Sequence, residues 1–69
     1  EQIENDLRKL VDNLPEEQKE VVMMRYFGDL SFKEIAEQTN VSINTALGRM
    51  RYALINLRKM IKENQLILT

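Results

Sequence analysis

Side chains that can hydrogen-bond to nucleic-acid bases are concentrated in residues 44–52. Asn44 and Arg51 carry amide and guanidinium groups that pair with base edges, and Gly48 lets a helix backbone come close to a partner. At about 100° per residue, these residues and Tyr52 fall on one outer face of a helix. The predicted base-contacting residues are Asn44, Thr45, Leu47, Gly48, Arg51 and Tyr52.

Other basic residues are better placed for phosphate groups than for bases. Arg58 and Lys59 lie further along the same segment, and Lys33 lies near the start of an earlier helix, where free amides attract phosphate. The predicted phosphate-contacting residues are Ser31, Lys33, Arg49, Arg58 and Lys59. For any one of these bases alone, a solvated surface side chain is an equally good interpretation.

The charge of the chain is nearly balanced overall but divided along its length. The formal net charge is -1, yet residues 1–37 hold ten acidic and five basic residues, whereas residues 38–69 hold one acidic and five basic residues. A basic second half fits a negatively charged partner such as nucleic acid. The alternative is that the two halves attract each other within one fold. The position of each basic residue on its helix must decide between these two interpretations.

Composition excludes several classes of function. The 69 residues allow one small domain, residues 1–69, and the absence of Cys and His removes thiol or histidine catalysis and the usual zinc sites. We therefore expect no enzyme, metal, cofactor or small-molecule substrate. No stretch approaches the roughly 18 apolar residues of a membrane span, which favours a cytoplasmic protein without a membrane partner. Because the chain begins at Glu1, we expect it to be part of a longer protein.

The spacing of apolar residues predicts an all-α fold of four helices at about 2–13, 15–27, 32–38 and 43–64. Pro15 suits the first turn of the second helix, and Gly28 is expected to end it. The predicted buried face of that second helix consists of Val21, Val22, Met23, Met24, Tyr26 and Phe27.

The start of the third helix has the clearest signal in the chain. Ser31 is the predicted N-cap, Glu34 its capping-box partner, and Leu30 with Ile35 is placed to form a hydrophobic staple. A short turn follows before Ser42 can cap the fourth helix. Two helices joined in this way predict a helix-turn-helix over about residues 31–59, in which the third helix braces the fourth.

Apolar residues of the fourth helix form two overlapping groups. The predicted inner face consists of Ala46, Met50, Ala53, Leu57 and Met60. A row with spacings typical of a coiled coil consists of Ile43, Leu47, Met50, Leu54, Leu57 and Ile61. We favour the interpretation that Leu54 and Ile61 cover the first helix or the apolar tail at 66–68, and a dimer seam or a groove for a partner is the alternative.

Residues 14–59 resemble region 4 of sigma-70 family RNA polymerase sigma factors, especially the extracytoplasmic-function group. The shared motifs are Leu14-Pro15 to Val21, Phe27 to Ser31, Glu34-Ile35-Ala36, and Ser42, Thr45 and Arg49. The resemblance implies a four-helix domain with a helix-turn-helix of the winged-helix-like or sigma region 4 type. It also implies binding to the minus-35 promoter element and to the flap of core RNA polymerase, with an anti-sigma protein as a further partner.

The chain departs from the family pattern on its fourth helix. Leu47 stands where family members usually carry Lys or Arg, and Gly48 where they carry Ser. Fewer basic residues imply weaker phosphate-driven binding, although Leu47 can touch a thymine methyl group. Two alternatives to promoter recognition are the helix-turn-helix output domain of a response regulator and a protein-interaction module with little affinity for DNA.

Overall fold

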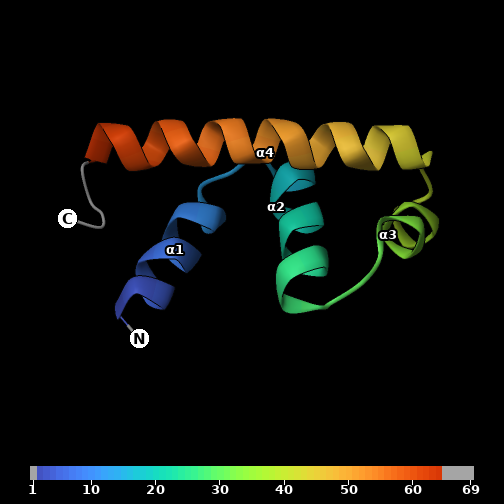
Figure 1. Cartoon of the computed structure of the whole chain (residues 1–69), viewed down its shortest axis with the longest axis horizontal. Coiled ribbons are helices and arrows are strands. Elements are labelled where there is room, and N and C mark those ends of the chain that lie inside the picture. The colour runs from blue at the N-terminus through green and yellow to red at the C-terminus, as the bar shows by residue number, and fades with distance from the viewer. Residues whose placement is uncertain (1, 65–69) are drawn as a thin grey trace.

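The computed structural model describes residues 2–64, and the side chains of residues 6–63 within them. The helices are α1 (Gln2–Asp12), α2 (Glu16–Val22), the π-helical turn η1 (Met23–Phe27), α3 (Phe32–Thr39) and α4 (Ile43–Asn64). Figure 1 shows α1, α2 and α3 on the same side of α4, which runs along the whole molecule. The predicted all-α architecture is confirmed, and no strand occurs in the described part of the chain.

The core lies between α4 and the three other helices. Its buried members are Leu10, Val11, Leu14, Val21, Val22, Ile35, Ala36, Ala46, Met50, Ala53 and Leu57. The predicted inner face of α4 is thus confirmed, and Met60 packs against this core from its edge. Ala46 and Ala53 are almost completely buried, and their small side chains let other helices approach the α4 backbone closely.

The junction between α1 and α2 differs from the prediction by one residue on each side. α1 ends at Asp12, and Pro15 is the N-cap of α2 rather than its first helical residue. The Pro15 carbonyl accepts hydrogen bonds from the backbone N–H groups of Gln18 and Lys19 at 3.0 and 2.9 Å. The missing N–H group of Pro15 costs no hydrogen bond at this position, because the first N–H groups of a helix have no intrahelical acceptor.

The prediction of one regular helix over residues 15–27 is wrong at its C-terminal end. The last turn is a π-helix, and its wide ring is closed by a 2.9 Å hydrogen bond from the Gly28 N–H to the Met23 carbonyl. Gly28 itself has a negative φ of -94°, and the left-handed residue that turns the chain is Asp29, with φ 57°. The Arg25 guanidinium donates to the Leu30 carbonyl at 3.0 Å and holds the following connection.

The predicted burial of Tyr26 and Phe27 is also wrong. Val21 and Val22 are buried, and Met23 and Met24 pack against the core, whereas Tyr26 is 64% exposed and Phe27 is 40% exposed. The wide turn changes the angular position of the residues that follow it, so a 3.6-residue period no longer describes which side chains face α4. Arg8 of α1 lies over the Phe27 ring, 4.6 Å from its centre.

One sequence prediction concerns the end of the chain. The apolar tail at 66–68 lies outside the described residues. Leu54 and Ile61 of the apolar row pack against the core. None of the described helices has the length and apolar character needed to cross a membrane.

The two glycines provide a matched test of this packing. A Cβ atom at position 28 would lie 2.8 Å from the Met24 carbonyl oxygen, whereas one at position 48 would meet nothing within 4 Å. We expect Gly28→Ala to destabilise the 69-residue chain by about 1–3 kcal/mol because the backbone must shift. Gly48→Ala should stabilise it by about 0.5–1 kcal/mol because alanine favours a helix. Urea unfolding measures both, and equal effects of the two substitutions would contradict the described turn.

Candidate nucleic-acid interface

The N-terminus of α3 is held by a complete capping box. The Ser31 hydroxyl oxygen accepts from the Glu34 backbone N–H at 3.1 Å, and the Glu34 carboxylate accepts from the Ser31 N–H at 2.8 Å. These bonds satisfy two amides that the first turn of a helix leaves free, and the predicted cap is confirmed. Leu30 packs against the core that contains Ile35, as a hydrophobic staple requires.

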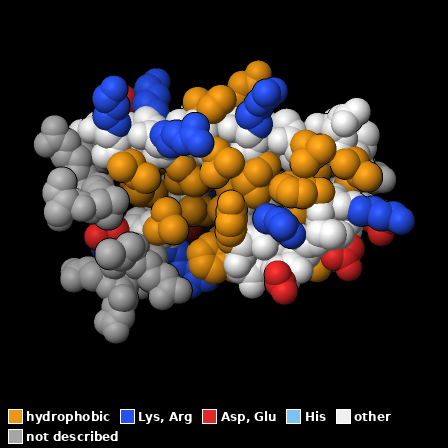
Figure 2. All heavy atoms as spheres, viewed as in Figure 1, with side chains coloured by type: hydrophobic (Ala, Val, Ile, Leu, Met, Phe, Trp, Pro, Cys, Tyr) orange, Lys and Arg blue, Asp and Glu red, His pale blue; other side chains and the backbone are white. Residues whose placement is uncertain are grey.

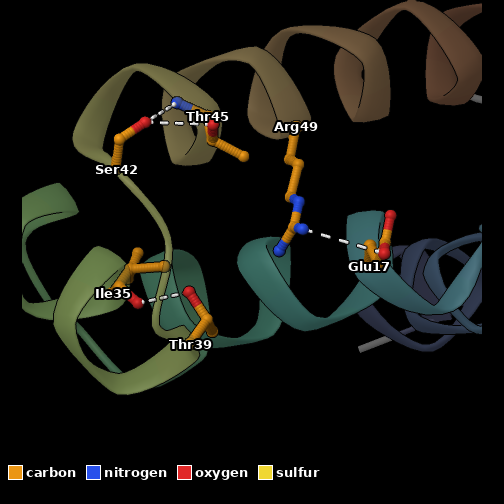
Figure 3. Close-up of polar contacts among 6 residues, drawn as sticks. All are labelled: Glu17, Ile35, Thr39, Ser42, Thr45 and Arg49. Carbon is orange, nitrogen blue, oxygen red and sulfur yellow. Dashed lines mark hydrogen bonds and ion pairs between the residues drawn. The ribbon is translucent and has the colours of Figure 1, made fainter.

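The turn between α3 and α4 has its own set of hydrogen bonds. Asn40 is left-handed, with φ 60°, and the Val41 N–H donates to the Ala36 carbonyl at 3.0 Å. The Thr39 hydroxyl donates to the Ile35 carbonyl at 2.7 Å (Figure 3). These contacts end α3 one residue later than predicted and fix the direction in which the chain enters α4.

Ser42 caps α4 as the sequence predicts. Its hydroxyl oxygen accepts a hydrogen bond from the Thr45 backbone N–H at 3.1 Å (Figure 3). The same hydroxyl group donates to the Thr45 hydroxyl oxygen at 3.0 Å. The Thr45 hydroxyl therefore has its proton left to donate to another group. The cap fixes the first turn of α4, where the predicted base-contacting residues begin.

All six predicted base-contacting residues lie outside the core. Asn44, Thr45, Leu47, Arg51 and Tyr52 are exposed, and Gly48 is half-exposed. Tyr52 is 60% exposed and Leu47 is 44% exposed. Because α1, α2 and α3 all pack on the opposite side of α4, no described element covers this surface, so an external partner can reach it.

The predicted phosphate-contacting residues occupy two kinds of environment. Lys33, Arg58 and Lys59 are exposed and make no ion pair within the described residues. Ser31 is exposed, but its hydroxyl oxygen already serves the capping box. Arg49 is the exception, since its side chain is 25% exposed and its guanidinium lies 3.7 Å from the Glu17 carboxylate (Figure 3).

Sequence reasoning missed two contacts that set the position of α4 on α2. One is the Glu17–Arg49 ion pair, and the other is a 2.7 Å hydrogen bond from the Asn56 amide to the Gln18 side-chain oxygen. Each joins residues more than 30 positions apart, so no local pattern in the sequence signals it. Both lie on the flank of α4 that faces α2, and together they orient the outer face of α4.

The charges of the outer face are mostly free to act on a partner. Arg51, Arg58, Lys59 and Lys62 are exposed and lack an acidic partner among the described residues. Figure 2 shows Lys and Arg side chains along the edge of the molecule that α4 forms. The two ion pairs among the described residues instead join Lys19 to Asp12 and Arg49 to Glu17, so Arg49 is the one basic residue of the second half that pairs with the acidic half. The basic face is therefore available for an anionic surface.

A second surface feature lies on the opposite side of α4. An apolar groove of about 360 Å³ is lined by Leu7, Val11, Val22, Tyr26, Phe27, Leu54 and Leu57. Figure 2 shows a band of hydrophobic side chains beneath α4. The groove explains why Tyr26 and Phe27 are exposed, because they form its wall instead of filling the core. Among the described residues, no cluster of acidic side chains is suited to hold a metal ion.

A short capped α3, a left-handed turn and a long capped α4 with a bare outer face define a helix-turn-helix domain. The family model described as "Sigma-70, region 4" matches residues 4–54. The chain therefore belongs to the sigma-70 region 4 family, as the resemblance in its sequence indicates.

Two curated relatives agree with this membership. The RNA polymerase sigma factor SigV of Bacillus subtilis (strain 168) is 35% identical over 63 residues, which are 91% of this chain and 38% of that protein. The ECF RNA polymerase sigma factor RpoE of Cereibacter sphaeroides is 36% identical over 53 residues, which are 77% of this chain and 29% of that protein. The chain thus spans about a third of the length of these relatives, and no solved structure matches it.

Family membership decides between the alternatives left open by the sequence. The resemblance to the extracytoplasmic-function group is confirmed, and the response-regulator output domain is not favoured. The sigma-70 family consists of transcription factors and not of enzymes.

The capping box makes a pH-dependent contribution that can be measured. The Ser31 backbone N–H, and secondarily its side chain, lower the pKa of Glu34 below its ordinary value of 4.5. A carboxylate with a lowered pKa in the folded chain stabilises it above pH 4.5, and this contribution is lost as the pH falls through the lowered value. We expect the unfolding free energy lost on Glu34→Gln to be larger near neutral pH than at about pH 3.

Urea unfolding of the wild type and of Glu34→Gln, at pH values from about 3 to neutral, tests the prediction. Glu37→Gln is the control because Glu37 lies on the same helix and its side chain has no hydrogen bond or ion pair to a described residue. A difference between wild type and Glu34→Gln that stays constant with pH would contradict the role of the ionised carboxylate.

Proposed function

We propose that this chain binds the minus-35 promoter element as the region 4 domain of a sigma factor that directs RNA polymerase in transcription initiation. The observation that carries the proposal is the uncovered outer face of α4, which begins directly after the Ser42 cap. In a helix-turn-helix, the N-terminal part of the second helix enters the major groove. Asn44, Arg51 and Tyr52 lie on this part of α4 and are exposed.

The outer face divides into residues for reading bases and residues for binding the DNA backbone. Asn44 and Arg51 are suited to adenine and guanine edges, respectively, because each offers two hydrogen-bonding groups in one plane. Arg58 and Lys59 lie two turns further along, where a straight helix leaves the groove and meets phosphates. Lys33, at the start of α3, supplies a phosphate contact from the bracing helix.

Arg49 makes a phosphate contact of a different kind in this proposal. Its guanidinium already has the Glu17 carboxylate as a partner, but Glu17 is 71% exposed and the pair is long at 3.7 Å. Such an exposed pair contributes little to stability and gives way readily to a phosphate. Arg49 therefore adds less to the affinity for DNA than the basic residues without an ion pair do.

The apolar groove supports the second part of the proposed function, which is docking on core RNA polymerase. Tyr26 and Phe27 form one wall of the groove, and Leu7 of α1 forms another. An apolar helix fits such a groove by burying its hydrophobic face, and the flap of the polymerase is the partner that the family resemblance implies. Because the groove and the basic face are on different sides of α4, both partners can bind at once. These partners place the proposed function in the cytoplasm.

Base reading and phosphate binding predict different results for Arg51 and Lys59. With a duplex selected from a random pool by the 69-residue chain, Arg51→Ala should cost about 1–3 kcal/mol of binding free energy and relax the sequence preference. Lys59→Ala should weaken binding to all duplexes alike and reduce the salt slope by about one. Fluorescence anisotropy at several salt concentrations measures both effects.

Lys9→Ala is the matched control, because it removes the same charge from exposed α1 and should leave specific binding nearly unchanged. If Arg51→Ala binds the selected duplex as tightly as the wild type does, the proposed readout by α4 fails.

Two tyrosines of similar exposure separate the two proposed partners. Tyr26 lies on the groove and is 64% exposed, and Tyr52 lies on the outer face of α4 and is 60% exposed. We expect Tyr26→Ala to lose affinity for core RNA polymerase while keeping affinity for DNA, and Tyr52→Ala to do the reverse. Each should change the binding free energy by about 1–3 kcal/mol, and pull-down and anisotropy assays measure the two affinities. Loss of both activities in one variant would point to unfolding and is checked by circular dichroism.

A further inference from the structure

Two large aliphatic side chains are exposed at the beginning of α4. Ile43 is 45% exposed and Leu47 is 44% exposed, and they lie one helical turn apart. Both are too exposed to be members of the core, whereas Leu54 and Ile61 of the same apolar row are partly buried against it. The packing of the described chain therefore gives no reason for two aliphatic residues at this place.

Gly48, next to Leu47, is equally unexplained by the fold. Its φ is not positive, so its backbone conformation suits any residue, and a Cβ atom there would meet nothing within 4 Å. Glycine inside a helix weakens the helix, and here no neighbour in the described chain benefits from it. What its missing side chain does provide is a low point on the outer surface, at which a partner can come close to the α4 backbone.

The neighbours of these residues indicate which chemical group they meet. Leu47 follows Asn44 by three residues and precedes Arg51 by four, so all three share one face of the helix. On the proposed function, this face lies in the major groove, where the C5-methyl of thymine is the apolar group that base pairs present. Asn pairs with adenine, whose partner is thymine, so one A·T pair can satisfy both an amide and an aliphatic side chain.

We propose that Leu47, supported by Ile43 and by the low surface at Gly48, is a specificity-determining residue that reads thymine methyl groups. The inference rests on the proposed binding of promoter DNA. The exposed Arg51 and Lys59 on the same side of α4 complement the charge of a duplex and favour DNA over an apolar protein as the occupant of this surface.

Replacing single thymines with deoxyuridine in the selected duplex tests the proposal, because only the methyl group is removed. Wild type should lose on the order of fourfold in affinity at one or two thymines, which corresponds to one buried methyl group. Leu47→Ala should bind the thymine and uracil duplexes equally at those positions. Ile55→Ala is the control, since Ile55 is 46% exposed on the same helix about 12 Å further along, and it should keep the thymine preference.

A second arm tests the low surface. Gly48→Ala should melt at a higher temperature than wild type and yet bind the selected duplex at least several-fold more weakly. Equal or tighter binding by Gly48→Ala would overturn the close approach at this position. Two results would overturn the reading of methyl groups but not the close approach at Gly48. One is tight binding by wild type that no thymine-to-uracil replacement weakens. The other is a Leu47→Ala variant that loses affinity for the thymine and uracil duplexes by the same factor, so that the thymine preference remains. Failure of wild type to bind any duplex would instead overturn the proposed function.

Discussion

The whole domain depends on one-sided packing against α4. Ala46 and Ala53 are buried at the points where the other helices approach, and a larger side chain at either place would push those helices away. Because α1, α2 and α3 share this single side, no described element covers the other side of the 22-residue helix. The core and the candidate interface are therefore two faces of one helix, so a change in the position of α4 would displace both.

Local signals in the sequence are sufficient for the existence of the helices and for the caps of α3 and α4. Ser31 with Glu34 and Ser42 with Thr45 act within one turn, so the residue types alone reveal them. The exposed face of α4 also follows from its period. The π-helical turn before Gly28 was not predicted, because a regular 3.6-residue period was assumed through Phe27, and this error placed Tyr26 in the core. The partners of Arg49 and Asn56 depend on how α2 crosses α4 and have no local signature.

Charge is distributed in keeping with this geometry. The basic residues of the second half of the chain lie mostly on the outer face of α4. Among the described residues, Glu17 from the acidic half forms an ion pair with Arg49 at the flank of this helix. Acidic residues of α2 near a DNA-binding face disfavour approach of that side to a duplex. On the proposed function, they therefore help to select which side of α4 meets DNA, even though the ion pair itself adds little stability.

The shortness of the reading segment has a consequence for how such a domain finds its target. Only about two turns of α4, from Asn44 to Tyr52, offer side chains suited to bases, and a few contacts of about 1–3 kcal/mol each cannot distinguish one site among the many of a genome. The proposed docking of the apolar groove on RNA polymerase offers a solution. A domain tethered to a larger assembly that holds DNA elsewhere has a raised local concentration at its binding site, so modest individual affinities combine into occupancy.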